Sequence, residues 1–351
     1  SMSRESNVGL RASEISVLDP SRWINSAPLT LKSLRGKIVL IDFWEYTCVN
    51  CIRTFPYLKE WHQRYSDKGL VIIGVHAPEF EFSKDRANVE AAAKKYGLTY
   101  PIVLDNDYAI WNAYANQYWP REFLIDQTGI IRHDHIGEGG YRETEAAIQK
   151  LLKAGIKSLK LPALKSYIRA EDKPGAVCYP MTPETYIGYA RGPAGNPGGF
   201  VRNQAAHYQD PGRHEDGKIY LSGFWRVEGE QATPAEPQEA NQKAERDVDV
   251  NQPAVLAIKY HATEVNLVLK PQPGSADKVM IEQDGTPLAR KDQGADVQVD
   301  REGRTYIEVT EPRMYRLVKN AVYGTHELKL TFPAGTISAY AFTFGSCEVA
   351  P

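Results

Sequence analysis

Apolar runs and amphipathic stretches alternate along the first half of the chain, from about residue 37 to residue 152. The apolar runs, which are strand candidates, cover residues 38–44, 69–75, 100–104, 121–126 and 130–135. The stretches with helical spacing cover residues 48–65, 85–96, 108–118 and 144–152. Strands that alternate with helices are typical of a layered α/β domain. We therefore predict an α/β fold for this half.

Two local signals refine this pattern. Pro56 lies inside the helical stretch that begins at Cys48, and a proline lacks the backbone N–H that a helix interior uses, so we expect a break or bend there. Gln127, Thr128 and Gly129 separate the last two strand candidates. Such a short turn predicts an antiparallel hairpin.

The second half has short runs of alternating polarity separated by turn signals such as Asp284-Gly285. These strand candidates are residues 218–224, 254–260, 264–269, 278–283, 304–310, 327–332 and 337–344. Many short strands with regular turns indicate an all-β jelly roll or β-sandwich. A Lys-rich, weakly patterned stretch before Pro174 separates the halves. We expect a first domain over 1–157, a linker over 158–175 and a second domain over 176–351.

Composition narrows the function classes. The chain has 351 residues, 42% of them hydrophobic, which is enough for two domains with their own cores. Its 42 basic and 44 acidic side chains leave a formal charge of -2, so no nucleic-acid partner is expected. No apolar run reaches the roughly 20 residues of a membrane helix, and the first residues lack the apolar segment of a signal peptide. An excised portion of an exported or membrane-anchored protein would show the same pattern.

The strongest chemical signal is Cys48-Val49-Asn50-Cys51, placed between an apolar strand candidate and a helix candidate. A Cys-x-x-Cys pair in this position is suited to thiol–disulfide exchange without any further cofactor. Cys48, at the helix start, has its thiolate favoured by the helix dipole and is the expected attacking sulfur. Cys51, one turn on, can attack the resulting mixed disulfide and is the expected resolving sulfur.

Two carboxyl groups precede this pair. Asp42 lies on the preceding strand candidate, where a buried carboxylate of raised pKa could accept the proton of Cys51. Glu45 is closer along the chain. Its negative charge would disfavour a thiolate, so we expect it to tune the reactivity of the cysteines.

The segment 44–51, followed by Arg53-Thr54-Phe55-Pro56, resembles the active-site stretch of TlpA-like thioredoxins, in particular the soluble C-terminal region of DipZ-type proteins. The resemblance implies that Asp42 matches the buried thioredoxin aspartate. It also implies that Trp119-Pro120 carries the cis-proline that faces the disulfide, where backbone groups can pair with an extended substrate. Val49-Asn50 replaces the Gly-Pro of thioredoxin and, with Trp119 and Pro120, is expected to contact substrate.

The resemblance continues into segments 182–191, 311–315 and 339–345, which are similar to the β-sandwich that follows the thioredoxin domain in DipZ-type proteins. That sandwich is similar to carbohydrate-binding modules, which implies a glycan ligand. Exposed aromatic side chains could stack on sugar rings, and the candidates are Tyr186, Tyr189, Trp225 and Tyr315.

Cys178 and Cys347 stand near the two ends of the second half, where the first and last strands of a sandwich are often neighbours. The sequence leaves two alternatives open: a structural disulfide between them, or two separate buried thiols. No metal is expected. Half of a zinc site at Cys48 and Cys51, and metal binding by His133 and His135, are the weaker alternatives because no second ligand pair follows at a suitable spacing.

We therefore expect an extracytoplasmic thiol–disulfide oxidoreductase that acts on protein thiols and disulfides. The resemblance implies electrons from a membrane donor of the DipZ transmembrane type, and a role in cytochrome c maturation. The alternatives are a glycan- or protein-binding envelope module with a scaffold thioredoxin domain, and a disulfide isomerase.

Overall fold

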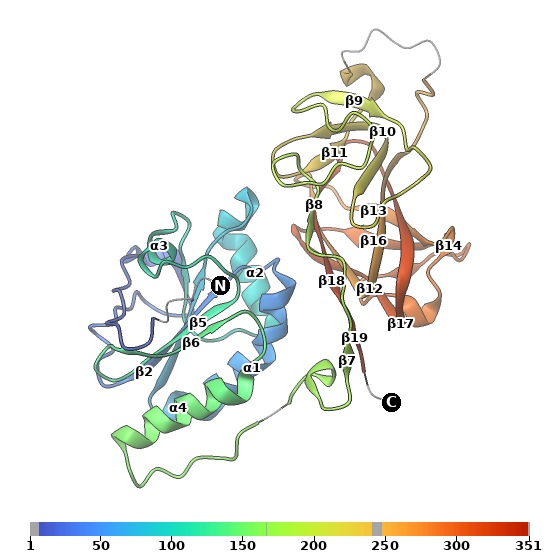
Figure 1. Ribbon diagram of the computed structural model, residues 1–351. Helices are drawn as coiled ribbons and strands as arrows, with labels where there is room; N and C mark the ends of the chain where they lie inside the picture. Colours follow the sequence, from blue (N-terminus) through green and yellow to red (C-terminus); the bar gives the residue numbers. More distant parts are fainter. Residues whose placement is uncertain (1–6, 166, 241–247, 350–351) are drawn as a thin grey trace. The chain divides into compact units, whose positions relative to one another are not determined.

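A computed structural model describes residues 7–165, 167–240 and 248–349 (Figure 1). By its contacts the chain divides into two compact units, residues 1–173 and 174–351. Within the described residues, no helix is long and apolar enough to cross a membrane.

The first unit is built on one mixed sheet with the strand order β1-β4-β3-β2-β5-β6. Its strands are β1 (Trp23–Ile24), β2 (Ile38–Trp44), β3 (Leu70–His76), β4 (Ile102–Leu104), β5 (Arg121–Ile125) and β6 (Ile131–Ile136). β2, β3 and β4 run parallel, whereas β5 pairs antiparallel with β2 and with β6. The predicted hairpin of β5 and β6 is therefore confirmed. β2 is central in this sheet, which explains why all of its side chains are buried.

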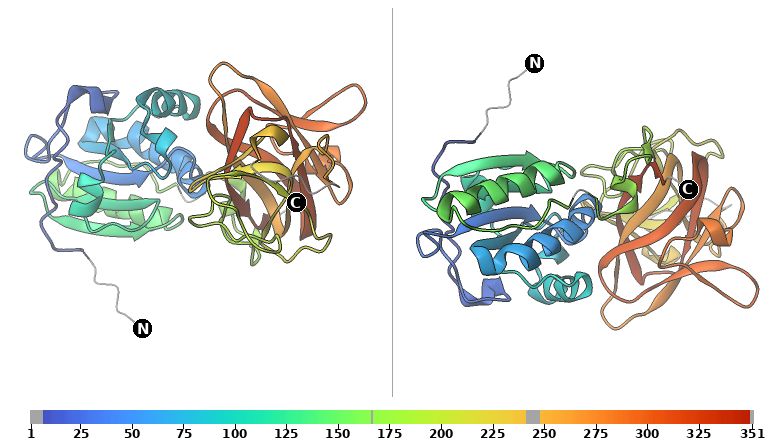
Figure 2. Two further views of the ribbon diagram at one scale, coloured as in Figure 1. Left: turned by 90° about the horizontal axis from the view of Figure 1, so that it is seen from above. Right: turned by 90° about the horizontal axis from the view of Figure 1, so that it is seen from below.

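Helices cover this sheet, as Figures 1 and 2 show. They are α1 (Val49–Tyr65), α2 (Arg86–Tyr96), α3 (Ala109–Ala113) and α4 (Tyr141–Gly155). Short 3-10 turns of this unit are η1 (Pro20–Arg22), η2 (Ser66–Lys68), η3 (Glu81–Lys84) and η4 (Ala170–Asp172). Phe43 packs edge-on against Trp111 of α3, whereas Trp44 packs edge-on against Phe55 of α1. Successive residues of β2 thus face different helices, because strand side chains alternate between the two faces.

Two helix predictions differ from the structure. α1 runs unbroken through Pro56, so of the two expected outcomes, a break or a bend, the break is wrong. A proline removes only one helical hydrogen bond, and the packed apolar face of α1 maintains the rest. α3 is much shorter than the predicted 108–118. The chain leaves the helix at Ala115, which has a φ of 49°, and the side chain of Asn116 then caps the following backbone.

Residues expected to form a linker lie against α1 and α4. The hydroxyl of Tyr57 accepts a hydrogen bond from the N–H of Ile168 and donates one to Asp172. The carboxyl of Glu145 accepts one from the N–H of Lys165. This stretch is therefore held to the first unit by side chains of its helices.

The second unit is all β, and every pair of named strands in it is antiparallel. Its strands are β7 (Val177–Cys178), β8 (Thr185–Tyr186), β9 (Ala205–Tyr208), β10 (Ile219–Val227), β11 (Ala232–Pro234), β12 (Ala254–Pro271), β13 (Asp277–Gln283), β14 (Thr286–Pro287), β15 (Gln298–Val299), β16 (Thr305–Val309), β17 (Arg313–Phe332), β18 (Ile337–Gly345) and β19 (Cys347–Glu348). Its 3-10 turns are η5 (Pro237–Glu239) and η6 (Arg290–Asp292). The predicted fold class, an α/β thioredoxin-like domain followed by an all-β domain, is confirmed.

β12 organises this unit. Its first half pairs with β10 and its second half with β18, while β17 accompanies it along most of its length. The register shifts between Ala262 and Glu264, and such an irregularity lets one strand pass between two layers. The two separate strands predicted over 254–260 and 264–269 are therefore one long strand.

Candidate active site

The two cysteines of the Cys-x-x-Cys pair occupy different environments at the start of α1. Cys48 is the N-cap residue, and its Sγ accepts a hydrogen bond of 3.2 Å from the N–H of Cys51. The two Sγ atoms are 2.7 Å apart, and both thiols are free in this structure. Cys48 is partly exposed, whereas Cys51 is fully buried. A substrate can therefore reach only the first sulfur directly.

Burial raises the pKa of the Cys51 thiol well above its ordinary value, and the neighbouring Cys48 and Asp42 raise it further. Asp42 itself is fully buried in the centre of β2, and among the described residues neither of its carboxyl oxygens has a hydrogen-bond partner. Burial, and then the nearby Glu122, raise the pKa of Asp42. A carboxyl group of raised pKa beside a buried thiol is suited to exchanging a proton with it.

Glu45 is also fully buried, in the short loop between β2 and α1. Its carboxyl accepts a hydrogen bond of 2.8 Å from the N–H of Thr47 and another from the Thr47 hydroxyl. Burial raises the pKa of Glu45 to about 7, and the charge of Glu79 adds to this effect. Glu45 therefore changes its charge near neutral pH, close to the backbone of Cys48, whose N–H donates to the Glu45 carbonyl.

The dipeptide between the cysteines is only partly available to a ligand. Val49 is buried, whereas Asn50 is exposed and its side-chain oxygen accepts a hydrogen bond of 3.1 Å from Arg53. Arg53 is buried and also pairs with Glu138 at 3.7 Å. These polar contacts orient Asn50 at the start of α1.

Trp119 and Pro120 are joined by a cis peptide bond just before β5. Because Phe43 lies opposite Arg121 in the β2–β5 ladder, Pro120 lies at the end of β2 from which the loop to Cys48 departs. The indole N–H of Trp119 donates to the carbonyl of Ala77. The carbonyl of Pro120 accepts a hydrogen bond from the N–H of Gly137, which fixes the backbone where β5 begins.

Glu122, which lies opposite Asp42, and Thr144, which hydrogen-bonds Glu122, were not predicted from the sequence, whereas His133 was considered only as a metal ligand. Glu122 lies directly opposite Asp42 across the β2–β5 ladder and is buried. Its acidic side chain within an apolar strand candidate was a signal, but the strand register that sets it beside Asp42 is not visible in a single sequence.

His133 and His135 each have a partner within the first unit. Nε2 of His133 lies 3.0 Å from the hydroxyl of Thr144, and Nε2 of His135 lies 3.2 Å from the carbonyl of Glu138. Among the described residues, no cluster of His, Cys, Asp and Glu is arranged to hold a metal ion.

The aromatic side chains named as sugar platforms are largely enclosed. Trp225 and Tyr315 are fully buried in the core of the second unit. The guanidinium of Arg191 lies 3.6 Å from the ring centre of Tyr186, and that of Arg202 lies 4.9 Å from the ring centre of Tyr189.

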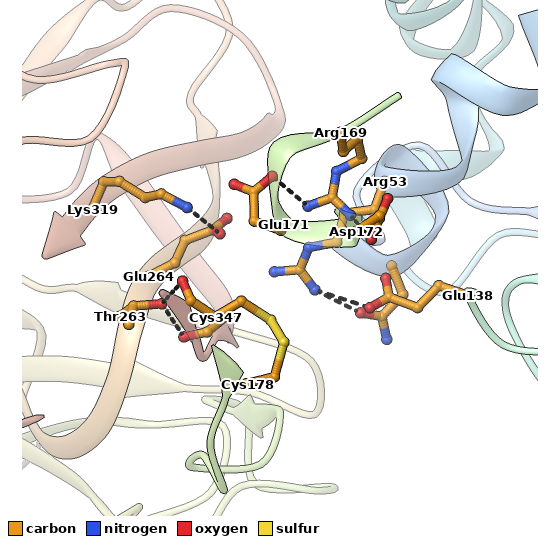
Figure 3. Close-up of a disulfide and its surroundings, with 12 residues drawn as sticks. Arg53, Glu138, Arg169, Glu171, Asp172, Cys178, Thr263, Glu264, Lys319 and Cys347 are labelled. Carbon is orange, nitrogen blue, oxygen red and sulfur yellow. Dashed lines mark hydrogen bonds and ion pairs between the residues drawn. A yellow bond between two sulfur atoms is a disulfide. The ribbon is translucent and has the colours of Figure 1, made fainter. Parts of the chain in front are cut away.

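Cys178 and Cys347 form a disulfide that joins β7 to β19. Figure 3 shows it together with Thr263, whose hydroxyl donates to the carbonyls of Gly345 and Cys347. This bond links the first and last strands of the second unit.

Comparison with known proteins agrees with both units. Residues 25–152 match the Redoxin family, and residues 182–345 match the family described as "Thioredoxin like C-terminal domain". The thiol–disulfide oxidoreductase YkuV of Bacillus subtilis is 30% identical over 37% of this chain and 87% of its own length. The thiol–disulfide oxidoreductase ResA of Bacillus cereus is 33% identical over 35% of this chain and 68% of its own length. The chain belongs to the redoxin-type, thioredoxin-like thiol–disulfide oxidoreductases.

Its two-domain organisation is DipZ-like. Protein DipZ of Mycobacterium tuberculosis is 38% identical over 268 residues, which is 76% of this chain and 35% of DipZ. The chain thus corresponds to about a third of the length of that relative.

Proposed function

We propose that this protein reduces disulfide bonds of other proteins outside the cytoplasm, with Cys48 attacking and Cys51 resolving. The observation that carries the proposal is the asymmetry of the two sulfurs: one partly exposed at a helix N-terminus, the other fully buried next to Asp42.

The Cys48 thiolate attacks a substrate disulfide, forms a mixed disulfide and releases one substrate thiolate. Cys51 gives its proton to Asp42, and the new thiolate attacks Sγ of Cys48, which releases the second substrate thiolate. The substrate gains two electrons, and Cys48 and Cys51 become a disulfide. Trp119 and Pro120 would hold the extended substrate segment beside this pair.

The disulfide between Cys178 and Cys347 supports a location outside the cytoplasm, because structural disulfides persist mainly in oxidising compartments. In such a compartment the oxidised Cys48–Cys51 pair needs a reductant. Since DipZ is much longer than the matched region, we propose that a membrane-embedded donor of the DipZ type supplies the electrons. The proposed substrate is a disulfide of apocytochrome c, which is reduced to the two thiols that haem attachment requires.

Insulin reduction tests the core of this proposal. Cys48→Ser should abolish turnover, and Cys51→Ser should accumulate a mixed disulfide that mass spectrometry detects. Full turnover by Cys48→Ser would refute the assignment. Recovery of scrambled ribonuclease by the wild-type protein without a reductant cycle would instead favour isomerisation.

A glycan ligand for the second unit is a second proposal, supported by a cleft of about 500 Å³ on β10, β12 and β17 that has both polar and apolar lining residues. Asp210, His214, Gln252, Glu327 and Lys329 line it. Binding of the whole chain to cell-wall glycans, lost in Glu327→Ala, would support this role. Unchanged binding in that variant would remove the cleft from consideration.

A further inference from the structure

Asp42 and Glu122 form a buried carboxyl pair that the exchange mechanism uses only in part. They are direct partners on adjacent antiparallel strands, so both side chains lie on the same face of the sheet. Asp42 is 0% exposed and Glu122 is 3% exposed. Burial raises the pKa of Glu122 to about 8. Groups so enclosed need a defined route to exchange protons with water.

The structure contains such a route on the side of Glu122 away from Asp42. The hydroxyl of Thr144, a fully buried residue of α4, hydrogen-bonds the carboxyl of Glu122. The same hydroxyl lies 3.0 Å from Nε2 of His133 on β6. His133 is only partly buried, so its ring connects this chain of hydrogen bonds to solvent.

We propose that Glu122, Thr144 and His133 form a proton relay between Asp42 and solvent. This inference rests on the proposed roles of Cys51 and Asp42. Before resolution, Glu122 gives a proton to the Thr144 hydroxyl, which passes its own proton to His133 and then to water. Asp42 transfers its proton to ionised Glu122, its ladder partner, and the Asp42 carboxylate can then accept the proton of Cys51. Protons move in the opposite direction when the carboxyl pair is reprotonated, and no electrons move along the relay.

Other titratable groups surround this relay. The buried hydroxyl of Tyr100 has no hydrogen-bond partner in the part of the chain that the structure describes, and its pKa is raised by burial and by the charges of Asp42, Glu122 and Cys51. Tyr141 of α4 also feels the charge of Glu122.

The groups around His133 are His135, Asp134 and Glu143. Burial and His135 lower the pKa of His133, which suits a ring that passes protons on without retaining them. His135 lies directly opposite Glu122 in the β5–β6 ladder, but its Nε2 contacts the carbonyl of Glu138. It is therefore a matched control for His133.

The test is stopped-flow reaction of the reduced protein with a chromogenic aryl disulfide. The first aryl thiolate reports attack by Cys48, and the second reports resolution by Cys51. Thr144→Val should slow the second release about tenfold or more and leave the first unchanged, because general acid–base steps contribute at least that much. Thr144→Ser should restore the rate, since it keeps the hydroxyl.

Imidazole rescue of His133→Ala distinguishes proton transfer by His133 from a purely structural role. The second release in this variant should be slow in an inert buffer and should recover as imidazole is added, whereas His135→Ala should remain near wild type without imidazole. If the second release were slow in His135→Ala and normal in His133→Ala, the proposed route through His133 would be refuted. If Thr144→Val does not fold, as judged by circular dichroism, His133→Ala and its imidazole rescue decide the question.

Failure of the relay and failure of the proposed function give different results. Normal second release in both Thr144→Val and His133→Ala refutes the relay alone. Persistence of the second release in Cys51→Ser refutes the assigned roles of the cysteines themselves.

Discussion

Glu45→Gln should make the first unit more stable at alkaline pH. In the unfolded chain Glu45 ionises near its ordinary pKa of 4.5, but in the fold burial raises that pKa to about 7. A raised carboxyl pKa means that stability is full below pH 4.5 and falls as the pH rises to 7. One pKa unit corresponds to about 1.4 kcal/mol, so ionised Glu45 costs the fold about 3 kcal/mol above pH 7.

Glutamine removes this cost and preserves the local contacts, since its carbonyl oxygen can still accept from the N–H and hydroxyl of Thr47. Urea unfolding followed by tryptophan fluorescence measures the effect. Of the six tryptophans only Trp225 lies beyond residue 173, so the signal reports mainly the unfolding of the first unit. The variant should match wild type at pH 4 and exceed it by about 3 kcal/mol at pH 8. Equal differences at both pH values would refute this reasoning.

Three further results are expected. Asp42→Asn should slow the release of the second aryl thiolate, with the first release unchanged, because Cys51 loses its proton acceptor; stopped-flow absorbance measures both phases, and equal slowing of the two would contradict the role. Replacing Cys178 and Cys347 together by Ala should lower the unfolding free energy of the second unit by roughly 3–5 kcal/mol, given the 169-residue separation that the bond closes; calorimetry checks this, with the transition of the first unit as the internal control. Burial alone would raise the pKa of Asp126, but hydrogen bonds from Ile130, Arg132 and Thr128 lower it from 3.8 to about 2. The stability that ionised Asp126 gives the fold is therefore complete above pH 3.8 and is lost as the pH falls through about 2. Asp126→Ala should remove that acid-dependent part of the stability, and a melting curve that keeps the wild-type pH dependence would show that the turn does not depend on this carboxyl.

The sequence predicted those elements whose physical signal is local. β2 is a continuous apolar run, and α1 begins at a cysteine that acts as its N-cap, so both could be recognised without knowledge of the rest of the fold. Only the end of β17, residues 327–332, was recognised, because polar residues such as Lys319, Asn320 and His326 interrupt the apolar alternation earlier in the strand. Its pairing with β12 holds this polar stretch extended.

The candidate site divides in the same way. Cys48, Cys51 and Asp42 are close in sequence and could be placed from spacing and resemblance. Glu122 and Thr144 come from β5 and α4, and only the antiparallel register and the packing of α4 bring them together. Long-range pairings of this kind are set by tertiary structure, so a single sequence carries little trace of them.

The bond between Cys178 and Cys347 also determines how the second unit responds to force. It connects the strands through which the chain enters and leaves that unit, so a pull applied at these two residues is carried by a covalent bond. The hydrogen bonds of the β-sheet between them bear no load until the disulfide is reduced. Under tension at these points, the oxidised unit should therefore remain inextensible, and the reduced unit should lengthen as its strands separate.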